Sequence, residues 1–131
     1  MRLAKKLSVR MVMGLALAMA LGSGVAQADE VSVGQKTFKK KCGTCHTIEA
    51  GEKDRVGPNL HGVFGRKAGV KESYTKYSKG MVASGLTWDE ATLDSYLANP
   101  RKVIKKTRMA FPGLKKKAHR DAVIAYLKTM Q

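Results

Sequence analysis

Cys42-Gly43-Thr44-Cys45-His46 is the most informative stretch of this 131-residue sequence. It contains both cysteines of the chain, separated by two residues, and a histidine directly follows the second cysteine. The probability that two cysteines and an adjacent histidine fall in this arrangement by chance is on the order of a few in ten thousand. We therefore expect this cluster to carry chemistry, and we interpret the remaining sequence around it.

The pattern C-x-x-C-H is typical of covalent heme attachment. Two thiols one turn of chain apart can each add to one of two neighbouring vinyl groups at the edge of the macrocycle. The adjacent His46 then lies beneath the ring and can offer a nitrogen to the iron. The motif therefore predicts a c-type heme as the bound group.

Two other interpretations of the motif are weaker. A thioredoxin-like C-x-x-C normally occurs in a βαβ context, and this sequence contains no strand signal. A zinc site would need a further ligand, such as His61 or His119, at an unusual spacing. We interpret both of these histidines as surface residues that do not bind a metal in the native protein.

The composition indicates one small, strongly basic domain. Hydrophobic residues make up 44% of the chain and charged residues 27%, which excludes a disordered chain. The chain has 25 Lys and Arg against 10 Asp and Glu, a net charge of +15. Such a surface favours anionic partners. No sequence motif indicates that nucleic acid is one of them.

The first 28 residues predict a secretory signal peptide that is cleaved after Ala28. A basic start at residues 2–10 precedes an apolar run from Met11 to Leu21 and a stretch of small residues. The apolar run is much shorter than the roughly 20 residues of a membrane-spanning helix. The alternative to complete cleavage is a minor form of the protein that keeps this segment as a membrane anchor. We expect a mature domain at residues 29–131, which keeps a net charge of +11 because the removed segment contains four basic and no acidic residues.

Hydrophobic periodicity predicts a helix near each end of this domain. Residues 31–41 keep close to helical spacing, with Ser32 and Gln35 as a capping box. Towards the C-terminus, apolar residues recur at helical spacing from Val123 to Met130 between polar neighbours. This pattern indicates an amphipathic helix.

A long loop region and a middle helix lie between these two helices. Residues 46–87 are rich in glycine and have no sustained helical or strand period, which indicates turns and loops. Loops of such length are uncommon in compact domains unless they wrap a bound group or form a site. The middle helix is expected at 88–98, with Thr87 and Glu90 as its capping box.

A heme iron held by one histidine needs a sixth ligand or an open face. Three methionines remain beyond the predicted signal peptide. Met130 falls on the apolar stripe of the last helix, where packing is the ordinary role of methionine, and Met81 lies in the glycine-rich region without a distinguishing context. Met109 lies in a constrained, non-helical segment.

Several blocks of the sequence, taken in order, carry a resemblance to a known family. They are Cys42-Gly-Thr-Cys-His46, Gly57-Pro58-Asn59-Leu60-His61-Gly62, Phe64-Gly65-Arg66-Lys67, Leu86-Thr87-Trp88, Tyr96-Leu97-Ala98-Asn99-Pro100, Thr107-Arg108-Met109-Ala110-Phe111-Pro112-Gly113 and Ile124-Ala125-Tyr126-Leu127. Over about residues 31–127 the chain resembles class I cytochrome c, of the mitochondrial and bacterial periplasmic type. The resemblance implies an all-α cytochrome c fold, with three main helices and long loops around one covalent heme c.

The resemblance also implies a role for each residue at the heme. Cys42 and Cys45 would hold the heme covalently, with His46 and Met109 as the iron ligands. The Pro58 carbonyl would accept a hydrogen bond from the second ring nitrogen of His46, which fixes the orientation of a metal-bound histidine. The remaining implied contacts are Arg66, Tyr77 and Trp88 at the propionates, Tyr96 near the Met109 sulfur and Phe111 over the heme edge.

Three positions qualify this transfer of roles. Tyr74 remains an alternative to Tyr77, because this part of the chain is about one residue longer than in the mitochondrial proteins. Lys105-Lys106 precede Thr107 where the family often has Pro-Gly, and Met81 stands where asparagine is common.

The resemblance further implies that the first and last helices cross. Gly34 and Phe38 of the first helix would meet Val123 and Tyr126 of the last. Glycine permits a close approach of two helices, so we expect Gly34→Val to destabilise the fold.

The expected function is that of a soluble periplasmic electron carrier with a single heme. It would carry single electrons, as a monomer, from a cytochrome bc complex to a terminal oxidase, reductase or photosynthetic reaction centre. Basic side chains would steer it to acidic docking surfaces of these membrane redox complexes. These side chains are Lys41, Lys53, Lys71, Arg101, Lys102, Lys105, Lys106, Lys115, Lys116 and Lys117.

Two alternatives from other functional classes are testable. A heme enzyme, chiefly a peroxidase, would result if Met109 left the iron and opened a coordination site. A thiol oxidoreductase would result if the two cysteines stayed free and exchanged with a disulfide.

Overall fold

The computed structural model describes residues 23–131. Residues 1–22, which hold most of the predicted signal peptide, lie outside the described residues. Within residues 23–131 no helix combines the length and the apolar character needed to cross a membrane.

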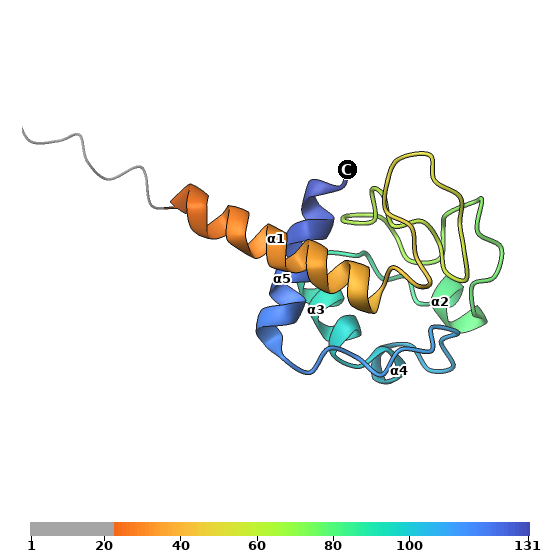
Figure 1. Cartoon of the computed structure of the whole chain (residues 1–131). Helices are drawn as coiled ribbons and strands as arrows, with labels where there is room; N and C mark the ends of the chain where they lie inside the picture. The colour runs from red at the N-terminus through yellow and green to blue at the C-terminus, as the bar shows by residue number, and fades with distance from the viewer. Residues whose placement is uncertain (1–22) are drawn as a thin grey trace, which may run out of the picture.

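Three helices form the frame of the molecule, and two short helices lie in the loops that connect them. In Figure 1, α1 crosses α5, α3 lies beside α5, and the loop region that follows α1 fills the opposite side. In the described part of the chain, the only extended pairing is an isolated antiparallel bridge between Lys67 and Thr87. The expected all-α fold is therefore confirmed. The helices are α1 (Ser23–Lys41), α2 (Lys79–Ala83), α3 (Glu90–Ala98), α4 (Pro100–Val103) and α5 (Lys117–Thr129).

The most extensive contact between helices is the crossing of α1 and α5. Gly34 is buried there, and a Cβ atom added to it would lie 1.9 Å from the Ala122 carbonyl oxygen and 2.9 Å from Tyr126 Cβ. The rings of Phe38 and Tyr126 meet edge to face, with their centroids 5.7 Å apart. The predicted pairing of the first and last helices is confirmed, and only glycine fits at its closest point.

The first helix begins earlier than predicted, at Ser23 instead of Val31. Ser32, the predicted cap, lies inside the helix and is exposed. Because residues 24–31 contain no proline and several good helix formers, helical hydrogen bonding continues past the local cap signal. The predicted cleavage point after Ala28 therefore lies within α1 of the full-length chain.

The middle helix begins at Glu90 and not at Trp88, because Asp89 provides its N-terminal cap. The Asp89 carboxylate accepts a hydrogen bond from the Thr92 amide at 2.8 Å. Trp88 lies before the helix, and its amide donates to the Arg66 carbonyl at 2.9 Å. The predicted capping box is wrong, because this long-range pairing places the helix start beyond it.

The region predicted as loop, residues 46–87, contains the short helix α2. Ser78 caps α2, and its hydroxyl accepts a hydrogen bond from the Met81 amide at 3.1 Å. A helix of five residues is too short to produce a helical period in the sequence. The rest of the region consists of turns, as expected.

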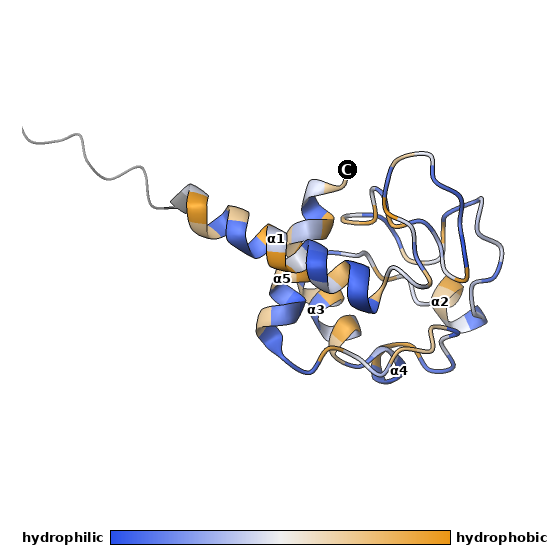
Figure 2. Ribbon diagram, viewed as in Figure 1, coloured by the Kyte–Doolittle hydropathy of each residue, from blue (hydrophilic) through white to orange (hydrophobic). Residues whose placement is uncertain are grey.

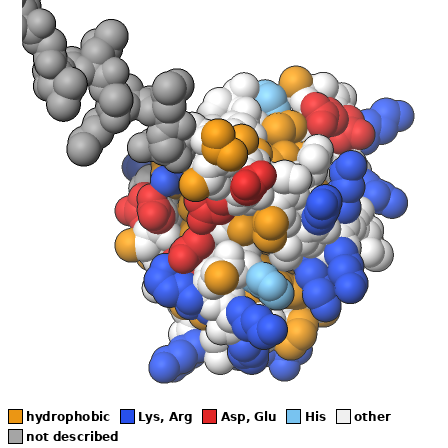
Figure 3. Space-filling view, turned by 60° about the vertical axis from the view of Figure 1, so that its left-hand side comes forward, with side chains coloured by type: hydrophobic (Ala, Val, Ile, Leu, Met, Phe, Trp, Pro, Cys, Tyr) orange, Lys and Arg blue, Asp and Glu red, His pale blue; other side chains and the backbone are white. Residues whose placement is uncertain are grey.

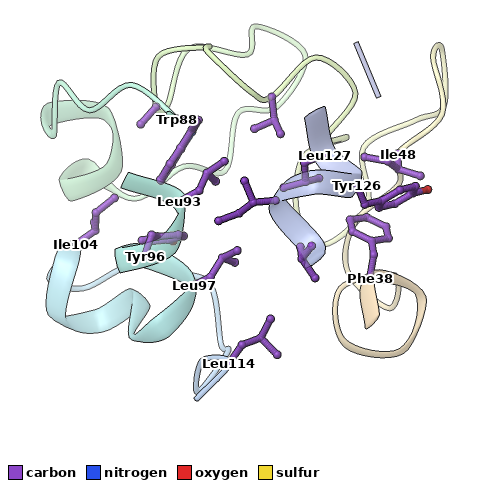
Figure 4. Close-up of a cluster of buried hydrophobic side chains, with 14 residues drawn as sticks. Phe38, Ile48, Trp88, Leu93, Tyr96, Leu97, Ile104, Leu114, Tyr126 and Leu127 are labelled. Carbon is purple, nitrogen blue, oxygen red and sulfur yellow. The ribbon is translucent and has the colours of Figure 1, made fainter. Parts of the chain in front are cut away.

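The hydrophobic core lies between α3, α5 and the loops. Figure 4 shows Trp88, Tyr96 and Leu97 on one side of it and Leu127 of α5 facing them, and all four are buried. Figure 2 shows hydrophilic residues along the outer loops and on the outward turns of α1 and α5. These four side chains also form one wall of a cavity that the surrounding loops complete.

Candidate functional site

A cavity of about 240 Å³ opens between α2, α3 and the loops. All ten residues that the sequence analysis assigned to a cofactor line this cavity, although they come from distant parts of the chain. The structure thus brings the whole predicted set together in one place. The ten are Cys42, Cys45, His46, Pro58, Arg66, Tyr77, Trp88, Tyr96, Met109 and Phe111.

The turn that follows α1 places the C-x-x-C-H motif on one wall of the cavity. The Cys42 amide donates to the Phe38 carbonyl at 2.8 Å, and the His46 amide donates to the Cys42 carbonyl at 2.9 Å. Cys42 and Cys45 are free thiols and partly buried. Burial, and next the charge of Cys45, raise the pKa of Cys42 to about 11. This thiol is therefore protonated at neutral pH, which does not suit a thiolate nucleophile.

His46 is held with one ring nitrogen bonded and the other free. Its Nδ1 lies 2.7 Å from the Pro58 carbonyl oxygen, and because a carbonyl can only accept, Nδ1 carries the proton. Burial lowers the pKa of His46, and the hydrogen bond to Pro58 offsets only part of this effect. The ring lies so close to Gly57 that an added Cβ atom would be 2.3 Å from His46 Cε1. The result is a fixed, neutral imidazole whose Nε2 keeps a lone pair for a metal.

Hydrogen bonds on both sides of His46 fasten the segment 57–60 to the motif. The Gly57 amide donates to the Cys45 carbonyl at 2.8 Å, and the Leu60 amide donates to the Thr47 carbonyl at 2.9 Å. The buried Asn59 side chain donates to Thr47 Oγ1 at 2.9 Å. Asn59, which stands in the same sequence block as Pro58, was not among the predicted site residues, and its buried side chain helps to hold this segment.

Met109 reaches the cavity from the loop between α4 and α5. Its amide donates to Thr107 Oγ1 at 3.3 Å, and the Tyr96 hydroxyl is hydrogen-bonded to the same oxygen at 3.0 Å. The Tyr96 hydroxyl, which the resemblance placed near the Met109 sulfur, therefore has Thr107 as its partner. Tyr96 also packs against Trp88, with ring centroids 4.9 Å apart. Helix α3 thus positions the methionine loop through Thr107.

A second methionine, Met81, lines the same cavity from α2. The sequence analysis gave it no function, because the short helix that positions it left no periodic signal. Met130 is not among the lining residues and packs against the hydrophobic core. Its expected packing role is confirmed.

Arg66, Tyr74 and Tyr77 supply polar groups to the lining of the cavity. Arg66 Nη1 donates to the His61 carbonyl at 3.2 Å, and the Tyr74 hydroxyl donates to the Val56 carbonyl at 2.6 Å. Burial raises the pKa of Tyr77, so its hydroxyl is protonated at neutral pH and can donate. Because the single hydroxyl proton of Tyr74 is already used, the geometry favours Tyr77 as the donor to an anion in the cavity.

His61 does not have the surface position that the sequence analysis expected. The residue is only partly exposed, and its Nδ1 is buried without a hydrogen-bond partner among the described residues. The His61 amide donates to Asn59 Oδ1 at 2.8 Å, and its carbonyl accepts from Arg66. These backbone bonds hold the residue against the body of the protein. His119 is exposed, as expected.

Basic side chains lie around the cavity. Lys41, Lys76 and Arg108 are among the lining residues, and Arg108 Nη1 donates to the Lys76 carbonyl at 3.2 Å. Two residues expected to face partners, Lys71 and Lys117, each form an ion pair with an aspartate. On the face shown in Figure 3, Lys and Arg side chains gather at the right and lower edges, and acidic side chains lie at the left, towards the centre and at the upper right. The basic edges favour contact with an acidic surface.

The donor set of the cavity fits a heme c. Two free thiols lie beside a neutral imidazole on one wall of the cavity, and Met109, which carries a thioether, lines the same cavity. The lining also includes apolar side chains and, with Arg66 and Tyr77, groups that can balance anionic propionates. Within residues 23–131 no group of three or more His, Cys, Asp or Glu side chains is arranged to hold a bare metal ion.

Comparisons with known proteins agree with this fit. The family model described as Cytochrome c matches residues 31–131. A cytochrome c from Ginkgo biloba is 46% identical over 103 residues, which are 79% of this chain and 90% of the relative. A cytochrome c from Kluyveromyces lactis is 47% identical over 94 residues, 72% of this chain and 84% of the relative. The solved structure of cytochrome cH from Methylobacterium extorquens is similar with a TM-score of 0.70 and 43% identity, covering 76% of this chain and 97% of that one.

Proposed function

The chain belongs to the cytochrome c family, whose members carry electrons and are not enzymes, and from this premise we propose how its own residues hold the heme c and exchange electrons. The observation that carries the proposal is that all ten predicted residues line one cavity. The heme would supply an iron that changes its charge by one unit. The residues of the chain would bind the heme and orient the iron ligands.

Cys42 and Cys45 would form thioethers with the heme, and His46 Nε2 and the Met109 sulfur would be the axial ligands. The chain orients both ligands independently of the heme. Pro58 holds the His46 ring through Nδ1, and Thr107 holds the backbone of Met109. A ligand pair that is fixed in this way changes little between two oxidation states, which suits a carrier of electrons.

Arg66, Tyr77 and Trp88 would hold the propionates, and Phe111 would cover the heme edge. A partly buried anion requires hydrogen-bond donors or a cation nearby. Arg66 provides the cation, and Tyr77 provides a protonated hydroxyl. The Tyr96–Thr107 pair would keep the methionine loop in place above the ring.

The proposed setting of this reaction is the bacterial periplasm. The signal peptide would be cleaved after Ala28, and the mature monomer would carry electrons from a cytochrome bc complex to a terminal oxidase, reductase or photosynthetic reaction centre. Lys41, Lys76 and Arg108 at the cavity, with the basic side chains beyond them, would draw the molecule to acidic surfaces of these complexes.

A pair of methionine variants tests the ligand assignment. Met109→Ala should keep the heme, as measured by a pyridine hemochrome assay, but lose the weak far-red sulfur-to-iron absorption band and lower the reduction potential. Met81→Ala, which removes a thioether from the same cavity, is the matched control and should keep the band. Loss of the band in Met81→Ala and its survival in Met109→Ala would reverse the assignment.

A further inference from the structure

Asp54 is a partly buried carboxylate that the proposed function does not use. Its Oδ1 accepts hydrogen bonds from the Asn59 amide at 2.7 Å and from Lys71 Nζ at 2.8 Å. Its Oδ2 accepts from Ser73 Oγ at 2.7 Å. The Asp54 side chain is 15% exposed. These three donors hold the Asp54 carboxylate in place and favour its ionised form.

The Asn59 amide that Asp54 binds belongs to the same peptide group as the Pro58 carbonyl. That carbonyl accepts the hydrogen bond from His46 Nδ1 at 2.7 Å. The carboxylate, the peptide group and the imidazole therefore form one continuous series of hydrogen bonds. In such a series each bond polarises the next, because electron density drawn towards one end of an amide strengthens the acceptor at the other.

We propose that Asp54 is a positioning residue for His46, which it orients and makes a stronger electron donor through the Pro58–Asn59 peptide group. The inference rests on the proposed function, since it concerns an imidazole that binds the heme iron. The negative carboxylate makes the Pro58 carbonyl a stronger acceptor, and a stronger acceptor draws the Nδ1 proton further from the ring. An imidazole with more negative character stabilises ferric over ferrous iron, so Asp54 lowers the reduction potential.

Lys71 and Ser73 set the strength of this effect. Both donate to the Asp54 carboxylate, and the Lys71 ammonium and the Ser73 hydroxyl also contact each other. Donation to the carboxylate withdraws electron density from it. Removing the Lys71 charge should therefore act in the direction opposite to removing the Asp54 charge.

The test compares Asp54→Asn with a matched control, Glu52→Gln. Glu52 belongs to the same loop and undergoes the same change of charge. Its carboxylate, however, accepts from the Ile48 and Glu49 amides at 3.2 and 3.0 Å, and not from the Pro58–Asn59 peptide group. In the purified heme protein, Asp54→Asn should raise the reduction potential, with a change of roughly three- to ten-fold in the equilibrium constant against a fixed reference couple. Tenfold is about 59 mV for one electron.

A spectroscopic measurement separates this relay from a general effect of charge. In the diamagnetic ferrous protein, the His46 Nδ1 proton of Asp54→Asn should move upfield and exchange with solvent several-fold faster. In Glu52→Gln the same proton should be unchanged. Equal potential shifts in the two variants, or an unmoved Nδ1 proton in Asp54→Asn, would overturn the proposal.

Lys71→Gln provides the second arm and keeps the Asp54 carboxylate in place. It should lower the potential and move the His46 Nδ1 proton downfield, and a shift of either quantity in the other direction would also overturn the proposal. If Asp54→Asn does not accumulate as a folded protein, this variant carries the test alone. Failure of the proposed function is recognised separately, because the wild-type protein would then give no pyridine hemochrome signal.

Discussion

The close contact between α1 and α5 makes Gly34 the position where a small substitution should destabilise the fold most directly. In Gly34→Ala the new Cβ atom would lie 1.9 Å from the Ala122 carbonyl oxygen and 2.6 Å from its carbonyl carbon. Both are backbone atoms, so no side-chain rotation can relieve the clash. The two helices must move apart by more than 1 Å, since non-bonded carbon contacts are favourable only near 3.5 Å.

Three contributions set the expected loss of stability in Gly34→Ala. Overpacking of a well-packed contact costs about 1–3 kcal/mol, and separating the helices also weakens the Phe38–Tyr126 ring pair, which contributes about 0.5–1.5 kcal/mol. The higher helix propensity of alanine returns about 1 kcal/mol. The middle of these ranges gives a net loss of about 2 kcal/mol, or roughly 8–16 °C in Tm for a domain of this size. Gly34→Val should lose more, because valine is larger and branched.

Thermal unfolding of the heme-loaded protein, followed by circular dichroism, measures this loss. Lys36→Ala is the control, because Lys36 is exposed on the same helix and its replacement should change stability by less than about 0.5 kcal/mol. If Gly34→Ala melted within a few degrees of the wild type, the α1–α5 contact would not be as close in solution as the structure has it, and the reasoning would be refuted.

Three further predictions concern the methionine loop, the Asp54 cluster and the basic surface. Lys106 has a left-handed φ of 59°, so Lys106→Gly should raise the free energy of unfolding by about 0.5–1 kcal/mol in chemical denaturation, while Lys105→Gly should not. Burial alone would raise the pKa of Asp54, but the hydrogen bonds from Lys71, Asn59 and Ser73 outweigh it and lower the pKa to about 2. The contribution of the Asp54 carboxylate to stability is therefore fully present above about pH 4 and is lost as the pH falls through about 2. On acidification, the free energy of unfolding measured by urea titration should fall by about 1–2 kcal/mol less in Asp54→Asn than in the wild type. Electron transfer to a membrane oxidase with an acidic docking surface should slow roughly tenfold or more between low and physiological ionic strength, and a rate unaffected by salt would contradict steering by the basic side chains.

Site residues could be predicted where their chemistry depends on residue type and on a fixed spacing in the sequence. Two thioethers to one ring require a fixed spacing of cysteines, and the adjacent histidine follows from the same geometry, so Cys42, Cys45 and His46 could be identified from five residues. The assignment of Met109 followed from the resemblance. The resemblance supplied the other six predicted residues, and all six line the cavity: Pro58, Arg66, Tyr77, Trp88, Tyr96 and Phe111.

The errors arose where a distant contact overrides a local signal. Thr87 and Glu90 form a valid capping box in the sequence, but pairing of Trp88 with Arg66 shifts the helix start to Glu90. The start of α3 therefore depends on the competition between local and long-range hydrogen bonds, which a sequence window cannot contain. Ser32 is a different case, because the good helix formers before it let α1 continue through the cap signal.

Long-range polar contacts were also beyond the sequence analysis. Arg120 lies in the last helix and carries no motif in the sequence, but its side chain is 12% exposed and binds Asp94 at 2.7 Å. It also donates to the Leu114 and Lys115 carbonyls at 2.9 and 3.0 Å. The arginine therefore ties α5 to α3 and to the loop that follows Met109. Charge and period alone cannot distinguish such a residue from a solvated one.

The cavity and the stability of the fold are energetically linked. Trp88, Tyr96, Leu97 and Leu127 belong both to the hydrophobic core and to the cavity lining. A group that fills the cavity is thus part of the core, and the proposed covalent attachment through Cys42 and Cys45 would make that contribution to folding permanent.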